Sequence, residues 1–197
     1  MIMSNIPGWF SGDHQKEVIK LLYKYNYPDS IGVEVGCLHG RSSYAISIAI
    51  NKGTLFCIDL WNNIETYNSS YTEAEIKKYN LPHEGLTNSL EVFLENTKDR
   101  NNIIHIQGSS PSIVKNWTKP IDFIFLDAAH YNPSDRENID FWLPKIKPGG
   151  TFLGHDWYPD RLFPDVNDNV EYMENLLNQK VTLIPNTSIW YFTLPKN

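Results

Sequence analysis

Two segments of the chain place polar residues where an apolar, strand-like run ends. The first is VEVGCLHGRS at residues 33–42, and the second contains Asp127, His130 and the pair His155-Asp156. In an open parallel sheet, ligands bind at the carboxyl ends of the strands, where such residues would gather. Carboxylates and histidines held together can transfer a proton or bind a metal ion. The sequence therefore predicts one crevice in which both kinds of chemistry are available.

The first segment has the features of a ligand-binding glycine loop. Gly36 and Gly40 lie between a predicted strand and a predicted helix, where glycine lets the backbone turn tightly and approach a ligand. The helix that opens near Arg41 and Ser42 would direct free N–H groups and its positive dipole end at the loop. The Gly-x-x-x-Gly spacing differs from the G-x-G-x-x-G of dinucleotide-binding loops. Glu34 beside the loop would repel a phosphate and attract a cationic amine.

Asp59, at the end of the next strand-like run, adds a second recognition group. A carboxylate at this position can accept hydrogen bonds from both hydroxyls of a ribose, although aspartate also caps turns after strands. Glu34, the glycine loop and Asp59 together favour a nucleoside that carries a positively charged tail. S-adenosylmethionine has both features, with its ribose at Asp59 and its ammonium group near Glu34. We therefore predict S-adenosylmethionine as the cofactor.

Hydrophobic periodicity indicates which elements must position these groups. Strands are expected at 31–35, 54–60, 103–106, 121–126 and 151–153, and helices at 12–25, 42–50, 89–99, 113–117, 135–143 and 170–177. Residues 148–150, Pro-Gly-Gly, are typical of a tight turn into the fifth strand. The runs 181–184 and 188–194 flank a short turn and predict an antiparallel hairpin. Strands that alternate with helices predict an α/β fold with a mostly parallel sheet.

Composition restricts the class of protein. The length of 197 residues suits one domain spanning residues 1–197, and an apolar content of 41% supports a packed core. A net charge of −6 without a basic run argues against nucleic acid as a partner. No apolar stretch is long enough to span a membrane, and the amino terminus lacks a secretory signal pattern. Cys37 and Cys57 are expected to be buried free thiols, which favours a cytoplasmic location, and a homo-oligomer is compatible with the sequence.

Several motifs, taken together, resemble those of a known enzyme family. The chain resembles the class I S-adenosylmethionine-dependent methyltransferases, and within them the macrocin O-methyltransferase and cephalosporin-hydroxylase-like group. The resemblance runs from about Pro7 to the final hairpin and rests on EVG at 34–36, GRS at 40–42, IDLW at 58–61, GSS at 108–110, DAAH at 127–130, PGG at 148–150 and GHD at 154–156. It implies a Rossmann-like sheet of seven strands with helices on both faces and the last strand antiparallel.

The resemblance implies a role for each matching residue. Those assigned to the cofactor are Glu34, Gly36, Gly40 and Ser42 at its methionine end, Asp59 at its ribose, Ser109 and Ser110 at its adenine, and Cys37, Leu60 and Asp127 beside these groups. Asp127 and Asp156 match metal ligands of the magnesium-using members, and His130 matches a proposed general base. The residue before Asp156 is often Glu in those members, but here it is His155. Because Mg²⁺ prefers oxygen ligands, a set of Asp127, His155 and Asp156 shifts the prediction from Mg²⁺ towards softer divalent cations.

These observations predict a methyltransferase that acts on a hydroxyl of a small molecule, such as a sugar or another natural-product-like acceptor. Asp127 and His130 would be catalytic, with His130 as the base and a divalent metal assisting. Two alternatives stay open. An NAD-dependent Rossmann oxidoreductase suits Asp59 but not the glycine spacing or Glu34, and a non-catalytic module would bind S-adenosylmethionine without turnover. The sequence names neither the acceptor nor the methylated atom.

The segments that would contact the acceptor, residues 62–86 and 157–169, have the least recognisable pattern. Residues 62–86 are polar and long for a connection inside a compact domain, so we expect them to be functional or partly helical. Trp61, Tyr67, Tyr71 and Tyr79 would either wall the acceptor pocket or form an ordinary packing surface.

Overall fold

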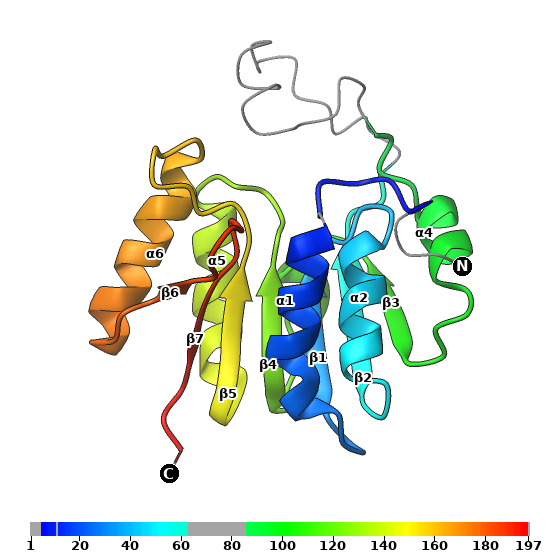
Figure 1. Ribbon diagram of the computed structural model, residues 1–197, viewed down its shortest axis with the longest axis horizontal. Coiled ribbons are helices and arrows are strands. Elements are labelled where there is room, and N and C mark those ends of the chain that lie inside the picture. The colour runs from blue at the N-terminus through cyan, green and yellow to red at the C-terminus, as the bar shows by residue number, and fades with distance from the viewer. Residues whose placement is uncertain (1–4, 11, 63–85, 197) are drawn as a thin grey trace.

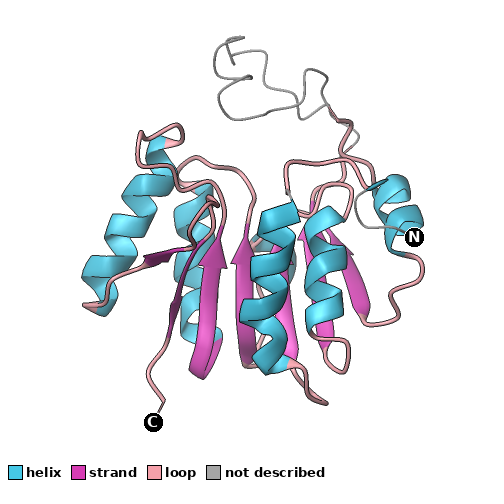
Figure 2. Ribbon diagram, in the orientation of Figure 1, coloured by secondary structure: helices cyan, strands magenta, loops and turns pink. Residues whose placement is uncertain are grey.

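The strands that the structure describes pair into one sheet, in the order β3-β2-β1-β4-β5-β7-β6 (Figures 1 and 2). The computed structural model describes residues 5–10, 12–62 and 86–196. The strands are β1 (Ile31–Val35), β2 (Thr54–Asp59), β3 (Ile103–Gln107), β4 (Ile121–Leu126), β5 (Ile146–Gly154), β6 (Thr182–Leu183) and β7 (Trp190–Thr193). Strands β1 to β5 are parallel, and β7 is antiparallel to both β5 and β6. The predicted α/β sheet with a late antiparallel hairpin is confirmed.

Helices cover both faces of the sheet, with α1 and α2 in front and α5 behind in the view of Figure 1. The helices are α1 (Gly12–Leu22), α2 (Arg41–Ala49), α4 (Leu90–Thr97), α5 (Ser134–Trp142) and α6 (Pro164–Leu177), with 3₁₀ turns η2 (Tyr23–Tyr25), η3 (Ser112–Val114) and η4 (Leu143–Lys145). Across the described ranges, no helix combines the length and the apolar composition that crossing a membrane requires.

The central strand β4 shows why the sheet needs both helical layers. All six residues of β4 are buried. Phe123 and Phe125 pack in the cluster that contains the apolar residues of α1, α2 and α4. Ile124 and Leu126 point the other way, into the cluster formed with α5 and α6. Because successive side chains alternate between the two faces, a strand covered on both sides must be continuously apolar.

The fifth strand differs from its prediction. β5 begins at Ile146 rather than at Thr151, so residues 148–150 lie inside the strand instead of forming a turn into it. Its pairing with β4 shifts register between Ile121 and Phe123. An irregularity of this kind accommodates extra residues in one strand, and its glycines tolerate the local bend. The predicted turn is therefore wrong: residues 148–150 belong to β5, as an irregularity at which the pairing with β4 is interrupted between Ile146 and Thr151.

Two helices also differ in length from the prediction. The expected helix at 113–117 is only the 3₁₀ turn η3, whereas α6 begins at Pro164, six residues before the predicted start at Val170. Proline is favoured in the first turn of a helix because its missing N–H would have no partner there. The prediction for residues 62–86, including its tyrosines, lies largely outside the described residues, which leave out 63–85.

A buried carboxylate joins β1, β4 and β5 near their amino ends, at the opposite end of the sheet from the cofactor crevice predicted at the carboxyl ends. Asp122, near the start of β4, is 2% exposed. Its oxygens accept hydrogen bonds from the Tyr27 hydroxyl at 2.5 Å, the Ile31 backbone N–H at 2.7 Å and the Lys147 ammonium at 2.9 and 3.0 Å. Hydrogen bonds to a buried charge are among the stronger ones in proteins. Asp122 therefore fixes the positions of β1 and β5 relative to β4.

We expect Asp122→Ala to lower the free energy of unfolding by about 3 kcal/mol, because it leaves the Lys147 ammonium and a backbone N–H without their acceptor. The measurement is urea unfolding at pH 7. The matched control is Asp168→Ala, which removes a half-exposed partner of Arg161 and should cost no more than about 1 kcal/mol. Equal effects from the two variants would contradict the structural role of Asp122.

Candidate functional site

A cavity of about 1060 Å³ lies over the carboxyl ends of β1, β2, β4 and β5. Single ligand pockets usually measure about 300–1,000 Å³, so this cavity has room for a nucleoside cofactor and a second small molecule. The predicted site residues that line it are Gly36, Cys37, Ser42, Asp59, Leu60, Ser109, Ser110, Asp127, His130, His155 and Asp156. Glu34 and Gly40 are not among its lining residues. The structure thus gathers most of the predicted residues around one space.

The two loop glycines are required by close backbone contacts. Gly36 has φ +87°, and a Cβ atom there would lie 1.9 Å from the Asp127 carbonyl oxygen. Gly40 has φ +88°, and a Cβ atom there would lie 2.8 Å from the Thr97 methyl group of α4. Both conformations are ones that side chains rarely adopt. Gly36 therefore lets the loop pass against the end of β4, while Gly40 packs on α4 and faces away from the cavity.

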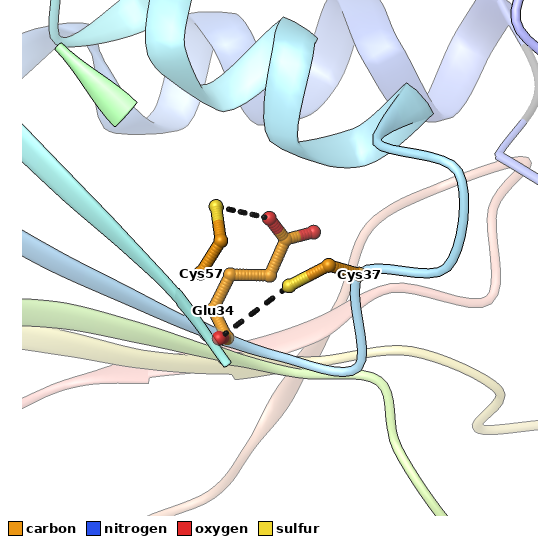
Figure 3. Close-up of side chains that lie close together, drawn as sticks. All are labelled: Glu34, Cys37 and Cys57. Atoms are coloured by element: carbon orange, nitrogen blue, oxygen red, sulfur yellow. Dashed lines mark hydrogen bonds between the residues drawn. The ribbon is translucent and has the colours of Figure 1, made fainter. Parts of the chain in front are cut away.

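Glu34 lies beneath α2 and not on the cavity wall (Figure 3). Its side chain is fully buried and accepts a hydrogen bond from the Ser42 hydroxyl at 2.5 Å. The Cys57 thiol donates to its other oxygen at 3.5 Å, and the Cys37 thiol donates to its backbone carbonyl at 3.7 Å. Strand alternation explains this orientation, because Val33 and Val35 face the α5 side and Glu34 must face α2. Its predicted contact with a cofactor ammonium stays a prediction.

Burial also sets the protonation of this group. Burial raises the pKa of the Glu34 carboxyl to about 7, although hydrogen bonds from serine hydroxyls oppose the shift. Burial likewise raises the pKa of both thiols, so Cys37 and Cys57 are protonated at neutral pH. The expectation of buried free thiols is confirmed. Because the thiolate is the reactive form, these cysteines are poor nucleophiles in the folded protein.

Asp59 holds the glycine loop against the end of β2. One carboxylate oxygen accepts hydrogen bonds from the backbone N–H groups of Cys37 at 2.6 Å and Leu38 at 2.9 Å. The other oxygen accepts from the side-chain amide of Asn88 at 2.7 Å and the backbone N–H of Trp61 at 3.2 Å. The carboxylate borders the cavity, but its hydrogen bonds in the structure go to the protein itself.

The two predicted adenine residues differ in their surroundings. The Ser110 hydroxyl donates to the Asn138 side chain at 2.6 Å, and the Trp142 indole N–H donates to it at 3.2 Å. It is therefore tied to α5. Ser109 borders the cavity beside it, as does Leu60, which is 48% exposed. These positions are compatible with a flat apolar group resting between Leu60 and Ser109, and their contact with adenine stays a prediction.

Two carboxylates and two imidazoles meet where β4 and β5 end. His130 Nε2 lies 3.3 Å from Asp127 Oδ1 and 3.1 Å from Asp156 Oδ2. His155 Nδ1 lies 3.5 Å and 3.1 Å from the same two oxygens. β4 and β5 are parallel neighbours in which Leu126 pairs with Gly154, so the residues after the two strands must come together. The predicted Asp–His group is therefore one cluster in space.

Charge within the cluster controls protonation of the histidines. Burial by itself lowers the pKa of both imidazoles, but attraction from Asp156 and Asp127 outweighs it. The pKa of His155 is raised to about 10, and that of His130 is raised well above its usual value. Attraction from the histidines also outweighs burial at Asp156 and Asp127, and holds the pKa of each carboxyl below its usual range. The cluster thus contains two opposed pairs of charges.

The cluster also fits a divalent cation. One ligand atom from each of Asp127, His130 and Asp156 lies within 4.8 Å of the others. His155 Nδ1 faces the same two carboxylate oxygens. Oxygen and imidazole nitrogen donors together suit Mn²⁺, Fe²⁺ or Zn²⁺ better than Mg²⁺, which prefers oxygen alone. The expected shift towards softer metals stays a prediction.

Two residues of this cluster have a strained backbone conformation. His130 has φ +58° and Asp156 has φ +61°, a left-handed conformation that is uncommon outside glycine. Asp135, at the start of α5, accepts a hydrogen bond from the Ala129 backbone N–H at 3.3 Å and so holds the loop before His130. Strained residues persist when their surroundings fix them, and they occur often at functional sites.

The structure adds His14, which the sequence analysis missed. His14 of α1 places Nδ1 3.3 Å from His155 Nε2, and their ring centroids lie 4.9 Å apart. The Ser188 backbone N–H donates to His14 Nε2 at 3.4 Å. Burial, and then repulsion from His155, lower the pKa of His14 to about 4, so it is neutral at pH 7. No motif marks this histidine, because only the packing of α1 on the sheet brings it to the site.

Aromatic side chains border the cluster on the cavity wall. The Phe163 ring lies 4.9 Å from the His130 ring, and Tyr158 lies 6.1 Å from Phe163. Trp61, which the sequence analysis considered for the acceptor wall, is instead 1% exposed and packs 4.6 Å from Phe93. For Trp61 the packing alternative is therefore correct. Tyr67, Tyr71 and Tyr79 lie outside the described residues.

Comparison with protein families matches residues 33–157 to the family described as a methyltransferase domain. The matched segment covers more than half of the chain and contains the glycine loop, Asp59 and the whole Asp–His cluster.

Solved structures show the same fold at low sequence identity. An O-methyltransferase from Bacillus cereus in complex with SAH is 16% identical, with 97% of this chain and 85% of that chain covered and a TM-score of 0.61. A precorrin-6y C5,15-methyltransferase from Geobacter metallireducens is 13% identical, with coverages of 96% and 89% and a TM-score of 0.60. An rRNA methylase from Streptococcus thermophilus is 14% identical, with coverages of 94% and 96% and a TM-score of 0.58. These likenesses confirm the Rossmann-like fold, while the narrower macrocin and cephalosporin-hydroxylase-like grouping stays a prediction.

We expect Glu34→Gln to change how stability depends on pH. The folded carboxyl has a pKa of about 7, against an ordinary value of 4.5, so between these values the unfolded chain releases a proton that the folded protein retains. The free energy of unfolding should therefore fall as pH rises through this range, by about 1.4 kcal/mol per unit of pKa shift. The variant lacks this loss, so it should gain stability relative to the unmodified protein between pH 5 and pH 8.

Urea unfolding at the two pH values measures this difference. Glu171→Gln is the matched control, because its carboxylate is 65% exposed. If Glu34→Gln follows the same pH profile as the unmodified protein, Glu34 is not a buried carboxyl with a raised pKa.

Proposed function

We propose that this chain, which belongs to the methyltransferase-domain family and is an S-adenosylmethionine-dependent methyltransferase, methylates a hydroxyl group of a small molecule. The observation that carries the proposal is the cluster of Asp127, His130, His155 and Asp156 on the wall of the cavity that also contains the glycine loop. A hydroxyl must lose its proton as it is methylated, and this cluster offers a proton acceptor beside two carboxylates. Family membership removes the alternative of an NAD-dependent oxidoreductase.

Solved structures of the same fold include an O-methyltransferase, a precorrin methyltransferase and an rRNA methylase, so the fold does not identify the acceptor. We infer the class of acceptor from the charge and the cavity of this chain instead. A net charge of −6 disfavours a polyanionic substrate such as RNA. The cavity volume of about 1060 Å³ and the rings of Tyr158 and Phe163 on its wall suit a compact ring-containing molecule. These features support a sugar or another small natural-product-like acceptor.

Positioning is the first task of the cavity. S-adenosylmethionine supplies a methyl group that its sulfonium already activates. In-line displacement needs nucleophile and methyl carbon about 3–3.5 Å apart and aligned with the sulfur. The glycine loop after β1 and Asp59 at the end of β2 border the cavity, as does the Asp–His cluster after β4 and β5. An acceptor hydroxyl at the cluster would thus face a cofactor held by the loop.

His130 is the proposed proton acceptor. Its side chain is 27% exposed, whereas that of His155 is 4% exposed, so His130 is the imidazole that an acceptor can reach. Proton uptake at Nε2 forms an imidazolium ion between Asp127 and Asp156, which stabilise it electrostatically. The adjacent Phe163 ring limits the access of water to this side of His130.

The proposed metal ligands are Asp127, His155 and Asp156. His155 Nδ1 faces both carboxylates, and its Nε2 is held by His14 and by the Ser188 hydroxyl at 3.2 Å. Metal-binding histidines are usually oriented by such a contact at their second nitrogen. A divalent cation bound there would lower the pKa of an acceptor hydroxyl.

We expect the protein to bind Mn²⁺ more tightly than Mg²⁺. We also expect that Asp156→Asn and His155→Asn each weaken Mn²⁺ binding by tenfold or more, because each removes a proposed ligand. Titration calorimetry of the purified variants with each metal chloride measures this. Asp168→Asn, which changes an exposed ion pair outside the cavity lining, is the control that should retain Mn²⁺ affinity. Loss of affinity in His130→Asn with retention in His155→Asn would reverse the roles proposed for the two histidines.

Without added metal, we expect methyl transfer to become faster as pH rises above neutrality. The raised pKa of His130 means that its unprotonated form, which the reaction needs, is populated only towards alkaline pH. His130→Asn should lower kcat/KM by about 10²–10⁴-fold and flatten the profile. The assay follows SAH release over a panel of sugars and phenols, with and without Mn²⁺. A variant with an unchanged rate and profile would exclude His130 as the base, and cofactor binding without turnover on any acceptor would favour a non-catalytic module.

A further inference from the structure

The carboxylate of Asp59 has no hydrogen-bonding capacity left for a ribose. A carboxylate accepts about four hydrogen bonds, two at each oxygen. Asp59 already accepts four in the structure, from Cys37, Leu38, Asn88 and Trp61, at distances of 2.6, 2.9, 2.7 and 3.2 Å. The 2′ and 3′ hydroxyls of a ribose would both need acceptors. Asp59 could serve one of them only by displacing a bond it already makes, of which the 3.2 Å contact from Trp61 is the longest.

Asn88 carries the missing acceptor beside Asp59. Its side-chain nitrogen donates to Asp59, and because a carboxylate only accepts, this bond fixes which end of the amide is oxygen. Asn88 is 9% exposed and borders the cavity. Its Oδ1 atom is buried and makes no hydrogen bond to any residue that the structure describes. A buried polar atom without a partner is costly, so beside a cavity it is a position at which a water molecule or a ligand group would supply the missing hydrogen bond.

The segment that holds Asn88 is anchored on the glycine loop. The ring of His39 forms a hydrogen bond with the Thr87 carbonyl at 2.7 Å. The side chain of Asn96, on α4, donates to the His39 carbonyl at 3.0 Å. α4 begins at Leu90, directly after this segment. The position of Asn88 is therefore fixed by the same loop that borders the cavity.

We propose that Asn88 Oδ1 accepts a hydrogen bond from a ribose hydroxyl of S-adenosylmethionine, while Asp59 orients the Asn88 amide and the glycine loop. This inference rests on the proposed function, because it takes S-adenosylmethionine as the ligand. It replaces the expectation that Asp59 accepts both hydroxyls by itself. Asn88 becomes the residue that distinguishes a ribose from a deoxyribose.

Titration calorimetry with SAH and with its 2′-deoxy and 3′-deoxy analogues tests this proposal. Asn88→Ala should weaken SAH binding by about tenfold, the worth of one hydrogen bond in a buried site. The same variant should bind one of the two deoxy analogues as well as the unmodified protein does, because that analogue lacks the hydroxyl that Asn88 accepts. Asn96→Ala is the matched control, since it loosens the same segment and should affect SAH and both analogues by the same factor.

Each result supports or overturns the proposal. If Asn88→Ala weakens SAH and both analogues equally, Asn88 only shapes the loop and the proposal is wrong. If that variant fails to fold, Asn88→Gln keeps an amide nitrogen for Asp59 and an oxygen acceptor, so it must still discriminate against one deoxy analogue, and a loss of discrimination overturns the proposal. If the unmodified protein does not bind SAH at all, the proposed function fails with it, whereas SAH binding without ribose discrimination overturns only the role of Asn88.

Discussion

The arrangement of the site depends on the contact between the ends of β1 and β4. The chain leaves β1 towards β2 on one side and leaves β4 towards β5 on the other, so the two connections diverge and open a crevice between them. The Asp127 backbone N–H donates to the Val35 carbonyl at 2.8 Å, which continues the strand pairing beyond the strands themselves. Only glycine at position 36 allows this approach. The glycine loop and the Asp–His cluster therefore border one cavity.

The two halves of the cavity, at the glycine loop and at the Asp–His cluster, differ in their polar interactions. At the loop, Asp59 accepts hydrogen bonds from the N–H groups around it and so holds the turn of the backbone. At the cluster, two carboxylates face two imidazoles, so protons and a divalent cation compete for the same space. In the first half, the carboxylate of Asp59 is saturated with internal hydrogen bonds. The second half contains groups that can gain or lose a proton, and removal of a proton from an acceptor hydroxyl needs such groups.

The fold leaves the acceptor undetermined. Methyltransferases with the same sheet act, by their descriptions, on substrates as different as a precorrin and an rRNA. What they share with this chain is the sheet, which builds the crevice, and function resides in the side chains around it. In this chain those side chains include His14, His130 and Phe163, which reach the cavity from three separate elements.

The sequence by itself determined the order of elements and the strand ends at which polar residues gather, because periodicity and strand-end chemistry are local properties. Tertiary structure decided where each side chain points. In the tertiary structure, Glu34 lies under α2 and the carboxylate of Asp59 accepts hydrogen bonds from N–H groups of the protein. The Pro-Gly-Gly segment lies inside β5, and His14 lies beside His155. Each of these outcomes depends on a partner far away in the sequence. Hydrogen-bond partners and burial are set when distant segments pack together, and a pattern read along one chain does not contain that information.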